Sequence, residues 1–181
     1  MGPARSSHVD RDNHARPFLG KRSQLIGTSR IPGCCSAQLI VSDSPVLYPY
    51  VTKPDILVVL SQEAFTRFAP ELEDGGTLII EQDLVWATNL PAEVRVFSVP
   101  ATRLAEELGK RMVLNSVMVG FFTAVTHLLE PDAVRKAFAD SVPASFQELN
   151  LKAFDRGFEY GTHAAAVTGE TLNLEEEVVK E

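Results

Sequence analysis

Cysteine is scarce in this sequence, and the two cysteines are neighbours. Of 181 residues, only Cys34 and Cys35 carry thiols. Adjacent cysteines rarely bond each other without strain, and a metal or iron–sulfur site needs about four suitably spaced ligands. We therefore expect two thiols in a reducing, cytoplasmic compartment, and no metal or cluster bound by this chain alone.

Long apolar segments are also rare, since only one stretch approaches the length of a membrane span. Residues 112–129 contain no charged side chain, and about 18 such residues are needed to cross a bilayer. The N-terminus has charges but lacks the apolar segment of a signal peptide. The long stretch also contains polar side chains, namely Asn115, Ser116, Thr123, Thr126 and His127. We therefore predict a buried core helix and no membrane association.

Positive charge is lacking over most of the chain. The formal net charge is −7, which argues against a general nucleic-acid binder, because such proteins need a basic face to neutralise phosphates. Residues 1–37 carry six Lys/Arg and two Asp/Glu, whereas residues 38–181 carry eleven and twenty-two. Two unlike compositions therefore meet near Gln38.

Sequence motifs for a self-contained active site are missing as well. The sequence contains no Walker motif, G-x-S-x-G or HExxH. The pair Gly75-Gly76 precedes an apolar run, whereas a phosphate-binding loop opens a helix. His127 and His163 have no carboxylate or second histidine at ligand spacing. We expect no catalytic residue and no metal ligand in this chain.

Apolar runs alternate with helical patterns after residue 37. Strands are predicted at 38–42, 56–60, 77–80 and 94–98, because short continuous apolar runs suit strands buried on both faces. Helices are predicted at 61–72 with Ser61 as N-cap, and at 100–108, 112–129, 131–139 and 143–161. This order predicts an α/β fold, with a Rossmann-like, mostly parallel sheet and helices on both faces. Little regular structure is expected before Gly33.

Three residues are candidates for contacts with a ligand or another subunit. Asn115 lies in the most apolar helix, where an amide needs a partner when it is buried. It either bonds a neighbouring loop or reaches a ligand or subunit interface. Pro100 and Thr102 follow the last strand, and ligands of open α/β sheets gather at the carboxyl ends of strands. The same turn is alternatively a simple strand-to-helix connection.

Six segments, taken in order, form a recognisable set. They are 40–43 (IVSD), 53–64 (KPDILVVLSQEA), 72–79 (LEDGGTLI), 99–109 (VPATRLAEELG), 115–120 (NSVMVG) and 149–157 (LNLKAFDRG). Together they resemble the gamma subunit (gamma domain) of 2-oxoacid:ferredoxin oxidoreductases. The resemblance covers about residues 36–161, and the size is closest to the 2-oxoglutarate type, although the pyruvate and branched-chain types share the motifs.

The resemblance implies a role within a larger enzyme. Such complexes oxidatively decarboxylate a 2-oxoacid, use coenzyme A and pass electrons to ferredoxin. Thiamine diphosphate and iron–sulfur clusters are expected on alpha and beta, or also delta, partner subunits. The gamma unit then contributes packing and ligand or subunit contacts, for which Pro100, Thr102 and Asn115 are the candidates. The alternative is a non-catalytic Rossmann-like scaffold or assembly protein.

The N-terminal part departs from this family. The family opens with a strand and a G-x-G-G-Q-G loop, and residues 1–35 contain no G-x-G pair. The family also has a loop similar to Ser-Tyr-Gly-Pro-Glu-x-Arg-Gly-Gly. A DNA sequence that encodes this loop, translated in a different reading frame, gives a peptide similar to residues 24–33. Our hypothesis is an out-of-frame or wrongly started segment at 1–35, a gamma-type domain at 36–161 and an acidic tail at 162–181. The first strand and the glycine-loop helix would then be missing or altered.

Overall fold

The computed structural model describes residues 22–31, 34–42, 51–90 and 93–178, with side chains for 36–41, 51–90 and 93–166. The chain divides into two compact units, Met1–Thr52 and Lys53–Glu181. Each unit is described by itself. The side chains of Cys34 and Cys35, and the acidic residues at the C-terminus, lie outside the described side chains.

The first unit contains a two-stranded antiparallel sheet. β1 (Arg22–Ile31) pairs with β2 (Cys34–Ser42), and the register shifts between Leu25 and Gly27. The prediction of little regular structure before Gly33 was therefore wrong. The stretch has no strict alternation, but it contains β-branched residues, which are typical of strands. The predicted strand at 38–42 exists, but it pairs with β1 instead of a parallel neighbour.

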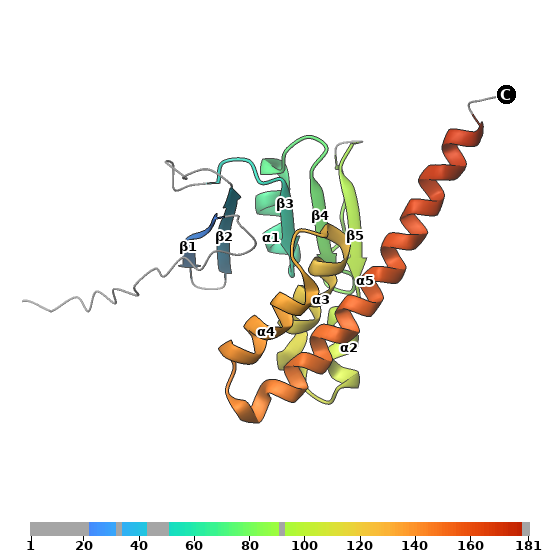
Figure 1. Ribbon diagram of the computed structural model, residues 1–181. Coiled ribbons are helices and arrows are strands. Elements are labelled where there is room, and N and C mark those ends of the chain that lie inside the picture. The colour runs from blue at the N-terminus through green and yellow to red at the C-terminus, as the bar shows by residue number, and fades with distance from the viewer. Residues whose placement is uncertain (1–21, 32–33, 43–50, 91–92, 179–181) are drawn as a thin grey trace, which may run out of the picture. The chain divides into compact units, whose positions relative to one another are not determined.

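The second unit contains the predicted parallel sheet. β3 (Ile56–Val59), β4 (Thr77–Glu81) and β5 (Arg95–Val99) lie in the order β3-β4-β5, and both pairings are parallel. Figure 1 shows the three strands side by side. Every residue of β4 is buried, as expected for a central strand covered on both faces.

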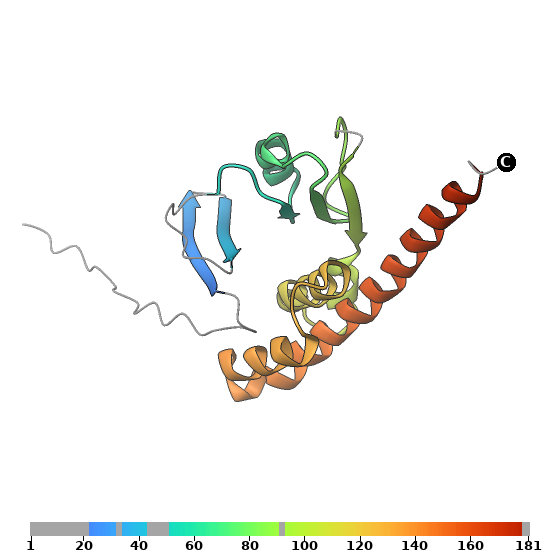
Figure 2. The ribbon, with the colours of Figure 1, turned by 45° about the horizontal axis from the view of Figure 1, so that its top comes forward.

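Helices cover both faces of this sheet, which confirms the predicted layers. Leu78 and Ile80 of β4 join the core beneath α1 (Gln62–Phe68). Ile79, which points to the opposite face, packs in a second core with α2 (Ala101–Glu107), α3 (Leu114–Thr126) and α5 (Ala144–Val178). Figure 2 shows α1 apart from the other helices, across the sheet. α4 (Pro131–Ser141) packs on α5.

Local signals set several boundaries. The Ser61 hydroxyl accepts the Ala64 N–H at 3.2 Å and caps α1 as predicted. Pro70 lies in a short 3-10 turn, Ala69–Glu71, so α1 ends before the predicted residue 72. Gly109, at φ +84°, terminates the turn after α2, a conformation that favours glycine. None of the described helices is long and apolar enough to span a bilayer.

α3 and α5 touch backbone to backbone. A Cβ added at Gly120 would overlap the carbonyl oxygen of Phe154, and one added at Gly157 would overlap that of Val117. A Cβ at Gly161 would lie 2.7 Å from the Ala124 Cβ. The prediction that the last helix ends near Gly161 was wrong, because Gly157 and Gly161 allow α3 to approach a helix that continues to Val178.

Candidate functional site

The turn after β5 holds two of the three predicted contact residues. Pro100 is buried and stands at the N-cap of α2, and Thr102 lies in the first turn. The Gln82 N–H donates to the Val99 carbonyl at 3.0 Å, so the β4–β5 ladder extends to the carboxyl edge of the sheet. The turn is therefore fixed directly to the end of the central strand.

A buried carboxylate anchors this turn. Glu81, the last residue of β4, is fully buried. Its Oε1 accepts the Thr102 N–H at 3.1 Å, and its Oε2 accepts the Asp83 N–H at 2.8 Å. Both oxygens thus find backbone donors, which a buried carboxylate requires. The carboxylate ties the start of α2 to the loop after β4.

An exposed ion pair forms a second link between the same segments. The Arg103 guanidinium donates to both carboxylate oxygens of Asp83, at 2.8 and 3.0 Å. This fork geometry adds directional specificity, although exposed pairs contribute only about 0–1 kcal/mol. Residues 81–83 therefore bind residues 102–103 through two contacts, the buried hydrogen bond of Glu81 and the exposed ion pair of Asp83.

Sequence reasoning did not select Glu81. The available signal was a carboxylate that ends a continuous apolar run, Thr77 to Ile80. Charged residues are rarely fully buried without partners, so a glutamate at this register indicates a specific hydrogen-bonding role.

The hydroxyl of Thr102 is unusual in this setting. Thr102 Oγ1 is buried and finds no hydrogen-bond partner among the described residues. An unsatisfied buried hydroxyl costs about 1–3 kcal/mol. Such a group in a native structure calls for an explanation, for example local strain or a bound water molecule.

Asn115 lies in the first turn of α3 and is exposed there. It stays a candidate for contact with a ligand or another subunit. The neighbouring Ser116 is buried instead, and its hydroxyl donates to Asn150 Oδ1 of α5 at 2.6 Å. The one-residue difference places Asn115 on the outer face of the helix. No described hydrogen bond connects Asn115 with Pro100 or Thr102.

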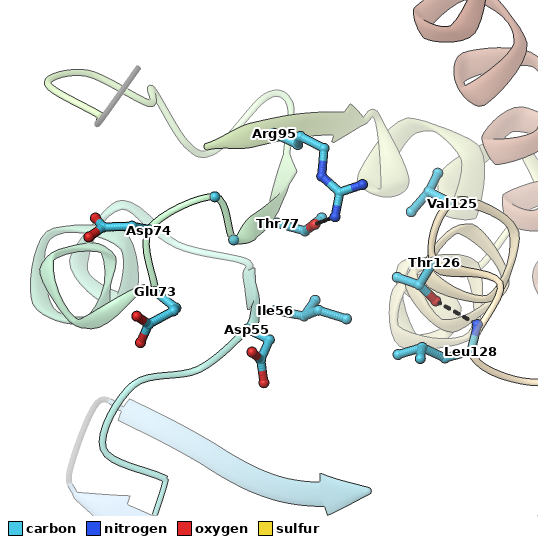
Figure 3. A pocket seen from close by; sticks show the side chains of 11 residues that line it. Asp55, Ile56, Glu73, Asp74, Thr77, Arg95, Val125, Thr126 and Leu128 are labelled. Atoms are coloured by element: carbon cyan, nitrogen blue, oxygen red, sulfur yellow. Dashed lines mark hydrogen bonds between the residues drawn. The ribbon is translucent and has the colours of Figure 1, made fainter. Parts of the chain in front are cut away.

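The larger cavity lies at the opposite, amino edge of the sheet. It has a volume of about 320 Å³ and lies between the starts of the strands and the end of α3. Figure 3 shows the Arg95 side chain reaching toward Val125 and Thr126, while one of its nitrogens donates to Thr77 Oγ1 at 2.9 Å. Asp55, Glu73 and Asp74 also line it. None of the three predicted contact residues lies there.

The two histidines considered in the sequence, His127 and His163, lie apart from any group of metal ligands among the described residues. His127 is exposed in a left-handed conformation at the end of α3. His163 lines a second cavity of about 250 Å³ with Leu104, Arg156, Glu159 and Tyr160. Within the described residues, no group of three His, Cys, Asp or Glu is arranged to bind a metal ion.

Comparison with known proteins identifies relatives over most of the chain. Residues 22–160 match the family model "Pyruvate ferredoxin/flavodoxin oxidoreductase". The 2-oxoglutarate synthase subunit KorC of Methanocaldococcus jannaschii is 36% identical over 140 residues, which cover 76% of this chain and 75% of KorC. KorC of Methanothermobacter thermautotrophicus is 38% identical over 144 residues, with 76% of each chain covered. The family match begins inside the segment 1–35.

Two further comparisons concern length and fold. Ketoisovalerate oxidoreductase subunit VorA of Methanothermobacter thermautotrophicus is 31% identical over 137 residues, which cover 74% of this chain but only 28% of VorA. The crystal structure of a keto/oxoacid ferredoxin oxidoreductase gamma subunit from Geobacter sulfurreducens superposes with a TM-score of 0.66 at 32% identity, covering 80% of this chain and 83% of that subunit. The relatives therefore include both a separate chain of similar size and a much longer chain.

Proposed function

The chain belongs to the pyruvate ferredoxin/flavodoxin oxidoreductase family, and we propose that it is the gamma subunit of a 2-oxoglutarate:ferredoxin oxidoreductase. Its relatives are subunits of oxidoreductases that act on 2-oxoacids as complexes. Identity of 36–38% with KorC chains over three quarters of their length is the observation that carries this proposal. VorA, a ketoisovalerate oxidoreductase subunit, is also a relative, although at a lower identity of 31%. A branched-chain 2-oxoacid is therefore the alternative substrate.

The proposed reaction is the oxidative decarboxylation of the 2-oxoacid with formation of a coenzyme A thioester. Thiamine diphosphate and iron–sulfur clusters supply the decarboxylation and electron-transfer chemistry when they are bound in the complex. We assign both groups to partner alpha and beta, or delta, subunits, with ferredoxin as acceptor, in the cytoplasm, as the resemblance to gamma subunits implies.

We infer that the carboxyl edge of the sheet supplies this chain's contacts with the assembly. Glu81 holds the Thr102 N–H there, and Pro100 precedes Thr102 in the same turn. Asn115 is exposed on α3. Neither of the two cavities contains these three residues. This placement favours subunit contacts over a small-molecule pocket formed within the chain.

Reconstitution tests the proposal. The full chain would be co-expressed with candidate alpha and beta chains, purified through a tag on this chain, and assayed for ferredoxin reduction that depends on coenzyme A. We expect activity with 2-oxoglutarate to exceed activity with pyruvate or branched-chain 2-oxoacids. A preference for another 2-oxoacid would correct the substrate.

A second outcome distinguishes the rival function. If the complex forms but is equally active without this chain, the chain is a scaffold or assembly protein. If no complex forms with any 2-oxoacid oxidoreductase chains, the gamma-subunit assignment itself is wrong.

A further inference from the structure

A single tryptophan stands out on the surface at the carboxyl edge of the sheet. Trp86, the one tryptophan of the chain, is 68% exposed. The segment 84–90 that contains it (LVWATNL) carries no charged residue, whereas 23% of the whole chain is charged. Interface cores share this composition, being depleted in charge and enriched in aromatic residues.

Trp86 is exposed, yet its backbone is held in place. The Trp86 N–H donates to Gln62 Oε1 at 2.8 Å, and Gln62 Nε2 donates to the Trp86 carbonyl at 3.4 Å. A side-chain amide thus pairs with Trp86 as a neighbouring strand would. Gln62 is itself positioned as the first residue of α1, directly after the capping residue Ser61.

The two neighbours of Trp86, Val85 and Ala87, attach the segment to the hydrophobic core. Val85 is buried in the core under α1, and Ala87 packs against the same core. The Val85 N–H donates to the Glu81 carbonyl at 3.1 Å, so Trp86 lies one turn beyond the end of β4. Alternation then directs the Trp86 side chain away from the core.

This arrangement matches a preformed anchor. A tryptophan side chain buries about 150–250 Å² when covered, and tryptophans are enriched among the residues that dominate binding energy. A fixed backbone also lowers the entropy lost on association. A structural role inside the chain would bury this surface, whereas here it faces outward.

We propose that Trp86 anchors this chain to a second protein chain of the oxidoreductase, by inserting into an apolar, uncharged pocket of that chain. The inference rests on the proposed function. The occupant is argued from chain length: the part of VorA that matches this chain is only 28% of VorA, so the rest of that protein is covalently attached to its domain. KorC, in contrast, matches this chain over 75% of its own length, so a chain of KorC's size must hold its counterpart through surface contacts.

The anchor shares the carboxyl edge with the other proposed contacts. Trp86 follows Glu81 at the end of β4, and Glu81 in turn holds Thr102. Segment 84–90 and the first turn of α2 therefore both follow the carboxyl ends of strands of the same sheet.

Three variants of the full chain, co-expressed with the partner chains, test the anchor. Trp86→Ala is expected to weaken assembly at least tenfold, measured by titrating the tagged chain against the purified partner chains. Gln62→Ala, which frees the Trp86 backbone but retains the indole, is expected to weaken it several-fold. Leu128→Ala is the matched control, because Leu128 is an apolar residue that is 43% exposed at the amino edge, and it is expected to assemble within twofold of the wild type.

Other outcomes overturn the proposal. Wild-type assembly by Trp86→Ala, with unchanged melting temperature, removes the anchor. Normal assembly with a raised KM for coenzyme A indicates that the indole stacks on a ligand ring instead. Loss of self-association with unchanged partner binding indicates a second copy of this chain as the occupant. If the wild-type chain itself fails to bind the partner chains, the proposed function fails and the anchor falls with it.

Discussion

The Glu81 carboxylate accepts the backbone N–H of Thr102 at 3.1 Å, across 21 residues of sequence. The contact joins the central strand to the first turn of α2, on which Pro100 and Thr102 lie. It is the buried member of a pair of links, since Asp83 and Arg103 form the exposed one. The geometry of the turn therefore depends on a carboxylate that no solvent reaches.

Substitution of Glu81 tests how much this link stabilises the fold. Glu81→Gln keeps the volume but places an NH2 group against one of two N–H donors, so we expect a loss of about 1–3 kcal/mol in the free energy of unfolding. Asp83→Asn is the control, with an expected loss of about 0–1 kcal/mol. Urea denaturation measures both. Equal losses for the two variants would contradict the central role of Glu81.

Gly157→Ala tests the close approach of α3 and α5. Helix propensity alone would make this change stabilising by about 1 kcal/mol. The added Cβ overlaps the Val117 carbonyl oxygen, so the helices must separate, and we expect destabilisation of about 1–3 kcal/mol or more. Thermal unfolding gives the sign directly. A raised melting temperature would show that the helices do not pack at this distance.

The buried polar contact between α3 and α5 predicts non-additive effects. Ser116→Ala removes the donor to Asn150 Oδ1, and we expect a cost of about 0.5–1.5 kcal/mol because a partly buried hydrogen bond is lost. Asn150 also donates to the Phe146 carbonyl at 2.8 Å. A double-mutant cycle with Asn150→Ala measures the coupling, and strict additivity would argue against the hydrogen bond.

One exposed pair on α5 predicts a titration shift. The hydrogen bond from Lys152 at 2.7 Å, together with its charge, lowers the pKa of Glu148. Since the pKa is lowered in the folded state, the pair stabilises the helix above the unfolded pKa of Glu148, and the effect is lost as the pH falls through the folded pKa. Lys152→Met should raise the Glu148 pKa toward its ordinary value, as measured by NMR titration of the side-chain carboxyl. An unchanged pKa would rule out the contact in solution.

Local chemistry accounts for what could be predicted of the second unit. Continuous apolar runs identified β3 and β4, the mixed run 94–98 (VRVFS) identified β5, and Ser61 identified the start of α1. Pro131 marked the first residue of α4. These signals act over a few residues, so they can be read without a partner segment.

The error before Gly33 has a different cause, which is long-range strand pairing. β1 forms with β2 although its own sequence lacks strict alternation, because a paired strand gains backbone hydrogen bonds that no local pattern reports. The domain division at 1–35, 36–161 and 162–181 stays a prediction. The family match begins at residue 22. Of the segment 1–35 that we proposed to be out of frame, only residues 1–21 lie outside this match, and they also lie outside the described residues.

The sequence by itself determined the α/β order, the layers and the resemblance to gamma subunits, because periodicity, caps and ordered motifs are properties of neighbouring residues. Only the tertiary structure decided that Ser116 rather than Asn115 is buried, that Glu81 holds the turn of Thr102, and that Gln62 fixes Trp86. Each of these depends on which segments pack against one another in the folded chain. That packing decides which side chains are buried and which donors and acceptors pair, so the role of a single amide or carboxylate depends on the atoms that it contacts.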